Sequence, residues 1–131
     1  MSPTNNLSVS IDLDAQRAYD FLSRPESFLK WASGLAASLR KIGDEWVAET
    51  PEGPAKVRFS GRNELGVLDH WVSFESGAEV YVPLRVIANG EGCELILTVF
   101  RRPGITDAQF EADAQWVRRD LLAAKKLLEA L

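Results

Sequence analysis

The sequence predicts a single α+β domain in which an antiparallel sheet packs against one long C-terminal helix. Three observations support this fold class. One strand and short helices come first, strands joined by short turns fill residues 37 to 101, and an amphipathic pattern runs from about Thr106 to Leu131. A chain of 131 residues buries about two-thirds of its unfolded surface, which is enough for one core. We therefore expect residues 1 to 131 to form one domain.

Composition and charge exclude several classes of protein. The chain has 46% hydrophobic residues, 26% charged residues and a net charge of −4, as an ordinary globular protein does. Its basic residues are scattered in pairs, whereas nucleic-acid binding needs concentrated positive charge, so we expect no nucleic-acid partner. No apolar run approaches the roughly 18 residues of a spanning helix. The start shows no secretory pattern. We expect a cytoplasmic protein without membrane insertion.

The chain has one cysteine, Cys93, and one histidine, His70. A single cysteine cannot form an internal disulfide, and the pair is too small for a Cys/His metal cluster. We therefore expect Cys93 to be a small buried residue, and we expect no metal and no cofactor.

The first segment predicts a strand followed by a helix. Apolar and polar residues alternate from Leu7 to Leu13, which is the period of a strand with one buried face. Asp14 is placed to cap a helix whose apolar residues recur at helical spacing until Pro25 stops it. A short second helix is expected over Phe28 to Trp31, before Gly34.

The turns between residues 43 and 92 predict an antiparallel meander whose register can be tested. A three-residue loop at Glu75 to Gly77 places His70 opposite Val82, and four-residue loops place Phe59 opposite His70 and Val82 opposite Val99. These registers agree on one apolar face, made of Val57, Phe59, Leu68, His70, Val72, Phe74, Val80, Val82, Leu84, Val86, Leu95, Leu97 and Val99. The opposite face is mixed and wetter, and carries Arg58, Asp69, Trp71, Tyr81, Arg85, Glu94, Ile96, Thr98 and Phe100.

Trp46 joins the apolar face if the loop from Pro51 to Pro54 has four residues, and the other face if it has three.

The last helix supplies an apolar surface that matches the apolar face of the sheet. Thr106 and Gln109 have capping-box spacing. Its apolar residues repeat in steps of four and three, as Phe110, Ala114, Val117, Leu121, Ala124, Leu128 and Leu131.

Five segments of the chain carry a family resemblance: the strand from Val9 to Leu13 with the following Asp14 to Leu22, then Pro25 to Trp31, Gly66 to His70, Pro83 to Gly90, and Phe100 to Gly104. With them the sequence resembles the START/Bet v 1-like superfamily, also called SRPBCC or polyketide cyclase-like, in particular its small bacterial members. The resemblance implies a helix-grip fold, in which a curved antiparallel sheet wraps a long C-terminal helix and leaves a cavity between them. Members typically carry or sense apolar small molecules, and some are cyclases or related enzymes. Fold analogy alone does not choose among these functions.

His70 is the sharpest candidate for chemistry, because it is the one polar residue in an apolar row. A histidine there could bind a ligand oxygen or act as a general acid or base. It could equally be a satisfied core histidine. No orienting partner is evident in the sequence, so a ligand contact or a structural role is favoured over catalysis.

Asp113 and Asp120 lie seven residues apart at the edge of the helix stripe. Paired carboxylates can do acid or base work, but ion pairing with Arg58, Arg85 or Arg101 is favoured. The inner aromatic residues either line a pocket or fill it. If Trp71, Tyr81, Ile87, Ile96 and Phe100 share the outer face, they form an apolar patch that indicates a homodimer.

The sequence thus predicts a binding protein for an apolar or amphipathic small molecule, lipid- or polyketide-like. One alternative is a cyclase- or dehydratase-like enzyme that uses His70, and another is a homodimeric interaction module. The expected ligand-binding residues are Trp31, Trp46, Phe59, His70, Val82, Leu84, Leu97, Val99, Phe110, Asp113 and Val117.

Overall fold

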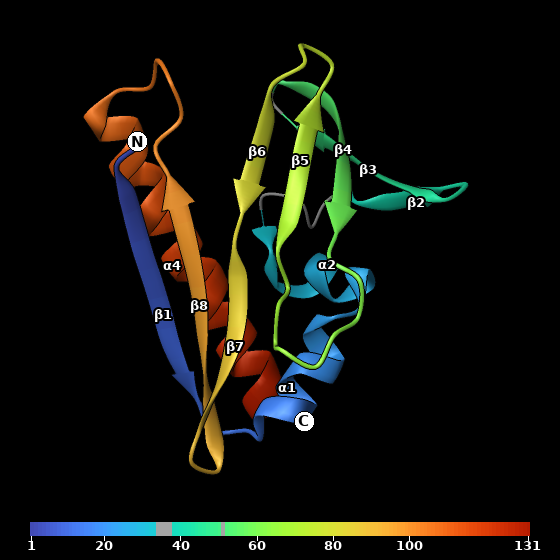
Figure 1. Cartoon of the computed structure of the whole chain (residues 1–131), viewed down its shortest axis with the longest axis vertical. Coiled ribbons are helices and arrows are strands. Elements are labelled where there is room, and N and C mark those ends of the chain that lie inside the picture. Colours follow the sequence, from blue (N-terminus) through green and yellow to red (C-terminus); the bar gives the residue numbers. More distant parts are fainter. Residues whose placement is uncertain (34–37, 51) are drawn as a thin grey trace.

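The strands form two antiparallel sheets joined through one bent strand (Figure 1). The computed structural model describes residues 1–33, 38–50 and 52–131, so the predicted turn positions Gly34 and Pro51 lie outside the described residues. In chain order the elements are β1 (Thr4–Ile11), α1 (Ala15–Leu22), η1 (Pro25–Ser27), α2 (Phe28–Trp31), β2 (Arg40–Ile42), β3 (Glu45–Thr50), β4 (Gly53–Phe59), β5 (His70–Phe74), β6 (Glu79–Val82), β7 (Leu84–Asn89), β8 (Gly92–Phe100) and α4 (Asp107–Glu129).

Pro83 marks the boundary between the two sheets. One sheet has the strand order β1-β8-β7, and the other has the order β2-β3-β4-β5-β6. Since only Pro83 separates β6 from β7, the two strands are one bent strand that belongs to both sheets. Proline has no backbone N–H and interrupts a ladder, which explains why the sheet divides here.

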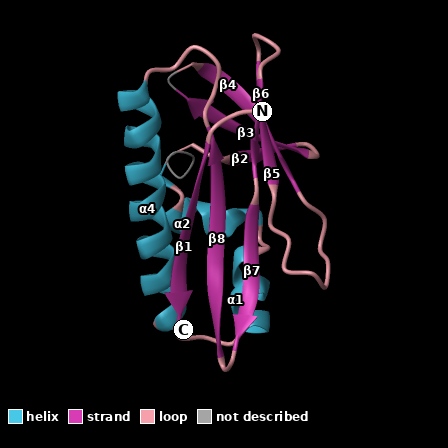
Figure 2. Ribbon diagram, turned by 60° about the vertical axis from the view of Figure 1, so that its left-hand side comes forward, coloured by secondary structure: helices cyan, strands magenta, loops and turns pink. Residues whose placement is uncertain are grey.

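Helices cover the inner face of this bent sheet. The long helix α4 packs against β1 and β8, while α1 packs against β7 and β8, and α2 contacts α4 (Figure 2). The capping box at the start of α4 is present: the Thr106 side chain accepts from Gln109 N–H, and the Gln109 side chain accepts from Thr106 N–H. Leu131, predicted to extend the apolar stripe, lies beyond the helix end and is exposed.

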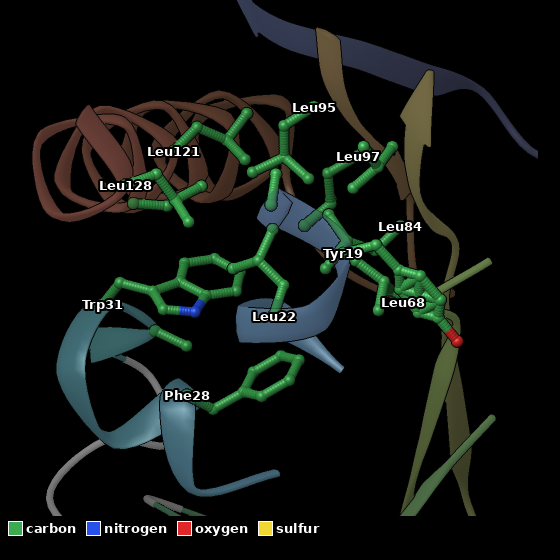
Figure 3. Packing of buried hydrophobic residues seen from close by; sticks show 14 of the residues in the cluster. Tyr19, Leu22, Phe28, Trp31, Leu68, Leu84, Leu95, Leu97, Leu121 and Leu128 are labelled. Atoms are coloured by element: carbon green, nitrogen blue, oxygen red, sulfur yellow. The ribbon is translucent and has the colours of Figure 1, made fainter. Parts of the chain in front are cut away.

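The core is solid where α4, α1 and the three-stranded sheet meet (Figure 3). Leu22, Leu84, Leu95, Leu121 and Leu128 are all less than 2% exposed and come from each of these elements. Cys93 is buried beside them, as predicted. Leu84 therefore belongs to the packed core.

The predicted registers are confirmed on both sides of His70, which pairs with Phe59 on β4 and with Val82 on β6. The pairing of Val82 with Val99 is absent, because the β7–β8 ladder ends at Pro83.

Trp46 lies on the predicted apolar face although its loop is shorter than expected. It pairs with Val57, and the ladder closes at Thr50 and Gly53. This register differs from the four-residue loop by two positions, which leaves every side chain on the same face.

The segment from Ser60 to Asp69 is an irregular loop, longer than the predicted four-residue loop from Asn63 to Gly66. Asn63 organises it: its side-chain Nδ2 donates to the Val67 carbonyl at 2.9 Å, and its backbone N–H donates to Tyr19 Oη at 2.8 Å. Gly66 has a φ of +72° and lies so close to β7 that a Cβ there would be 2.2 Å from the Val86 carbonyl oxygen. The loop is thereby fixed against both α1 and β7.

Candidate functional site

A pocket of about 420 Å³ opens between the two sheets and the N-terminal half of α4. It lies beyond the solid core, on the side where β6 and β8 diverge (Figure 1). It is lined by Phe28, Trp31, Ala32, His70, Val80, Tyr81, Val82, Leu97, Thr98, Val99, Phe100, Arg102, Asp113, Trp116, Val117 and Asp120.

His70 forms part of the pocket wall and is only 5% exposed. The Phe28 ring meets it edge-on at 5.2 Å, and the Phe59 ring lies at 5.9 Å. Its Nδ1 lies 3.5 Å from the Leu68 carbonyl oxygen, its one hydrogen-bond partner within the part of the chain that the structure describes. Burial lowers the pKa of His70 to about 4, so the ring is neutral near pH 7. This geometry is that of a wall histidine without an orienting carboxylate or hydroxyl.

Trp31 also lines the pocket, where its ring lies 5.1 Å from that of Phe28, and it is 4% exposed. Its Nε1 is buried and has no hydrogen-bond partner among residues 1–33, 38–50 and 52–131. A buried N–H group without a partner costs about 1–3 kcal/mol. Among the described residues, the indole is therefore held by packing.

Asp120 is held by Ser33. The Ser33 hydroxyl donates to Asp120 Oδ1 at 2.6 Å, and the Ser33 N–H donates to Oδ2 at 3.2 Å. Trp116 Nε1 donates to the same hydroxyl oxygen. Burial raises the pKa of Asp120 despite these hydrogen bonds.

The predicted ion pairs of Asp113 and Asp120 with strand arginines are wrong. Arg85 pairs with Asp69, Arg101 pairs with Asp107, and Arg58 stacks over a tryptophan. The physical reason is direction: Arg58 and Arg85 lie on the outer face of the sheets, away from α4. Asp113 stands exposed at the pocket edge, without an ion pair among the described residues.

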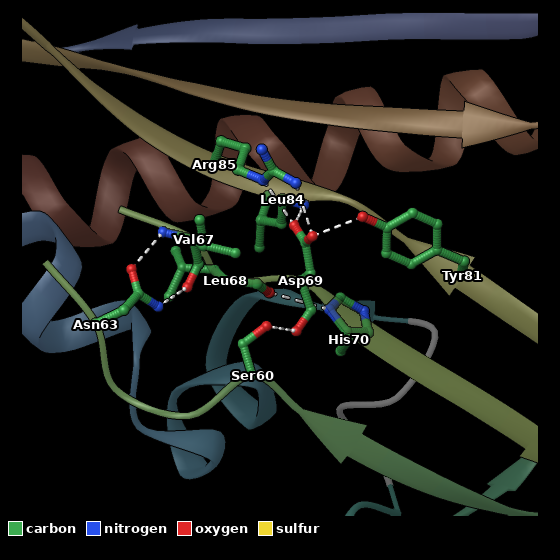
Figure 4. Close-up of polar contacts among 9 residues, drawn as sticks. All are labelled: Ser60, Asn63, Val67, Leu68, Asp69, His70, Tyr81, Leu84 and Arg85. Carbon is green, nitrogen blue, oxygen red and sulfur yellow. Dashed lines mark hydrogen bonds and ion pairs between the residues drawn. The ribbon is translucent and has the colours of Figure 1, made fainter. Parts of the chain in front are cut away.

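Asp69 joins β6 and β7 on the outer face through hydrogen bonds that the sequence did not indicate (Figure 4). Its Oδ1 accepts from Arg85 Nε at 2.8 Å and from Leu84 N–H at 3.0 Å. Its Oδ2 accepts from Arg85 Nη2 at 2.8 Å and from Tyr81 Oη at 2.6 Å. The Arg85 guanidinium holds the pKa of Asp69 down to about 2. Asp69 lies on the outer face, as predicted, but it is only 4% exposed, so the expectation that it is wet is wrong.

Aromatic side chains stand at the mouth of the pocket. The Tyr81 ring of β6 stacks on the Phe100 ring of β8 at 6.0 Å and on Trp71 at 5.2 Å, and Arg58 covers the outer side of Trp71 at 4.3 Å. Arg102 lies beside them and pairs with Glu52 at 3.1 Å. Tyr81 and Phe100 reach the pocket because the sheet divides beneath them.

The structure brings most, but not all, of the predicted site residues together. Those that line the pocket are Trp31, His70, Val82, Leu97, Val99, Asp113 and Val117. Leu84 is in the solid core, and Phe110 is half-buried outside the pocket lining. Trp46 and Phe59 line a separate hollow of about 460 Å³ beside β3 and β4. Ligand binding by any of these residues stays a prediction.

Trp116 and Asp120, which lie along the apolar stripe of α4, also line the pocket. The pocket residues that the sequence did not indicate are Phe28, Ala32, Val80, Tyr81, Thr98, Phe100 and Arg102. The available signal was Pro83, since a proline inside an apparent strand indicates an edge or a break. A break there turns outer-face residues of β6 and β8 into pocket residues.

Two broader features of the described residues bear on function. None of their helices has the length and apolarity to span a membrane. Nor do three or more of their His, Cys, Asp or Glu side chains group in a way that could hold a metal ion.

No protein-family model and no curated protein matches the sequence. Solved structures do resemble it. XoxI from Bacillus cereus has a TM-score of 0.74 at 11% identity, over 98% of this chain and 96% of that one. The Aha1 dimer from Colwellia psychrerythraea has 0.70 at 14%, over 97% and 96%.

A START superfamily protein from Mycobacterium smegmatis is similar over 97% of both chains, with a TM-score of 0.64 and 11% identity. Likeness at such low identity reports the fold alone. The two antiparallel sheets and the long C-terminal helix agree with it. The chain therefore has the START/Bet v 1-like, helix-grip fold.

Proposed function

We propose that this protein binds an apolar or amphipathic small molecule, lipid- or polyketide-like, in the pocket between β6, β8 and α4. The observation that carries the proposal is a pocket of about 420 Å³ with mostly apolar walls. Small-molecule sites are typically about 300–1,000 Å³ and apolar, with a few polar groups that orient the ligand. Here the apolar walls come from Val80, Val82 and Val99 of the strands and from Val117 of α4.

His70 in the wall favours a ligand that carries a hydroxyl group. Because Leu68 offers a carbonyl oxygen, Nδ1 of the neutral ring is the donor, and Nε2 is left as an acceptor. A hydroxyl on an otherwise apolar ligand would donate to this nitrogen.

The proposal is tested with 1-anilinonaphthalene-8-sulfonate, a fluorescent apolar probe, by titration of wild type, Val117→Trp and Leu122→Trp. Val117 lines the pocket, whereas Leu122 lies on the same helix and is 53% exposed. We expect saturable binding by wild type and Leu122→Trp, and a Kd raised by about tenfold or more in Val117→Trp, because the indole fills the pocket. Equal affinity of all three proteins would contradict the proposal. Native mass spectrometry of protein from its own host would then identify the ligand.

The enzyme alternative has less support. A cyclase- or dehydratase-like reaction through His70 would need a second polar group that orients the ring. Among the described residues, its one hydrogen-bond partner is a backbone carbonyl. Its low pKa also makes the ring a weak base at neutral pH.

A homodimer through the outer sheet face is the second candidate. The stacked rings of Trp71, Tyr81 and Phe100 favour it, because Tyr81 and Phe100 are 37% and 38% exposed. Exposed apolar patches commonly mark interfaces. The similar Aha1 protein is a dimer in solution.

A further inference from the structure

We propose that β6 and β8 are the gate of the pocket, and that they alternate between the split arrangement and a paired arrangement that closes it. This inference rests on the proposed function, because a gate requires a ligand to admit. Both strands contribute to the pocket wall: Val80, Tyr81 and Val82 come from β6, and Thr98, Val99 and Phe100 come from β8. Joining the two strands would seal this side of the pocket.

The strands are already in register to pair. The β7–β8 ladder joins Leu84 to Leu97, and the Thr98 N–H donates to the Pro83 carbonyl at 3.1 Å. Continued without any slip, the same register places Val82 opposite Val99 and Tyr81 opposite Phe100. Closing therefore needs a change of strand direction above Pro83 and no shift along the chain.

The first backbone hydrogen bonds that closing would add lie between Tyr81 and Phe100. In an antiparallel ladder, pairs that exchange two hydrogen bonds alternate with pairs that exchange none. Pro83 and Thr98 form a pair of the first kind, so Tyr81 and Phe100 are the next such pair. Within the part of the chain that the structure describes, no backbone hydrogen bond joins β6 to β8. The peptide groups of Tyr81 and Phe100 therefore face the gap ready to pair.

Pro83 makes the base of the gap weak. A pair at this position would normally have two backbone hydrogen bonds, but proline has no N–H to give. Only the bond from Thr98 to the Pro83 carbonyl remains. The strands can separate here at the smallest loss of hydrogen bonding, which makes Pro83 the hinge.

Side chains hold the separated strands near each other on the outer face. The rings of Tyr81 and Phe100 stack at 6.0 Å across the gap, and Tyr81 Oη donates to Asp69 at 2.6 Å. Asp69 also binds Leu84 N–H and Arg85, on the far side of the hinge. The hinge at Pro83 is therefore fixed, while β6 and β8 are held near each other only by side-chain contacts.

The test locks the gate with a disulfide. Val82 and Val99 would form a pair without hydrogen bonds, whose Cα atoms lie about 4.5 Å apart in a paired ladder, within the range a disulfide bridges. The variant Val82→Cys/Val99→Cys is made with Cys93→Ala. We expect its oxidation to weaken binding of 1-anilinonaphthalene-8-sulfonate by about tenfold or more, with recovery after reduction. Hydrogen exchange at Tyr81 and Phe100 should slow in the oxidised form, which shows that the strands paired.

A matched control comes from the same ladder. Ala88 pairs with the native Cys93 at the opposite end of β7 and β8, in the same class of pair. Oxidised Ala88→Cys should bind the probe as the reduced protein does. Failure of the Val82–Val99 disulfide to form, or formation with unchanged binding, would overturn the gate. Absence of probe binding in the reduced wild type would instead overturn the proposed function.

Discussion

His70 is a neutral group whose burial links stability to pH. Its pKa is about 4 in the folded protein, against an ordinary value of 6.5. The unfolded chain binds this proton more tightly than the folded chain does. Stability from this residue is therefore complete above pH 6.5 and falls as the pH drops from 6.5 toward 4.

Replacement of His70 by Gln should remove this acid sensitivity. Between pH 7.5 and pH 4.5 the wild type should lose about 2–3 kcal/mol of unfolding free energy more than His70→Gln, by urea denaturation. Because the chain has one histidine, its ring protons also give an isolated NMR titration. A ring that titrates near pH 6.5 would show that the side chain is solvated and would contradict the burial described.

Asp69 and His70 are neighbours whose side chains serve opposite faces. His70 points into the pocket wall, while Asp69 points outward to Arg85 and Tyr81 (Figure 4). The alternation of a strand predicted this division. It did not predict that Asp69 would be buried, because its burial depends on partners that the bend at Pro83 brings over it.

At the scale of the elements, the loop from Ser60 to Asp69 depends on Gly66. Gly66 and Gly43 have φ values of +72° and +62°, so alanine is strained at both positions. At Gly66 a Cβ would also meet the Val86 carbonyl oxygen at 2.2 Å, whereas nothing lies within 4 Å of one at Gly43. Gly43→Ala should cost about 1 kcal/mol, and Gly66→Ala at least about 2 kcal/mol more, in urea unfolding. Equal losses would mean that the loop can move away from β7.

The elements also show what a sequence can and cannot predict. The capping box at Thr106, the apolar stripe of α4 and the registers around His70 were predictable, because each depends on local spacing or on a short turn. The split at Pro83 is masked, because the alternating pattern continues in register across it and the proline is the single sign of a break. The pocket mouth depends on that split, so the alternation alone assigns Tyr81 and Phe100 to the outer face.

At the scale of the whole molecule, the homodimer proposed as the second candidate function would form through the outer sheet face. If the second candidate function holds, Trp71→Lys should convert a dimer to a monomer in sedimentation at high protein concentration, because a charge would enter the interface. Leu122→Lys, on the exposed side of α4, should leave the dimer intact. A wild type that sediments as a monomer would remove this candidate.

The two halves of helix α4 have different surroundings. Its C-terminal half, through Leu121 and Leu128, is locked into the solid core, while Asp113 and Val117 of its N-terminal half face the pocket. One continuous helix is thus packed into the core at its C-terminal end and borders the pocket at its N-terminal end. On the proposed function, substitutions at Val117 should change ligand preference more than substitutions at Leu121 or Leu128 do, and the latter should cost more stability.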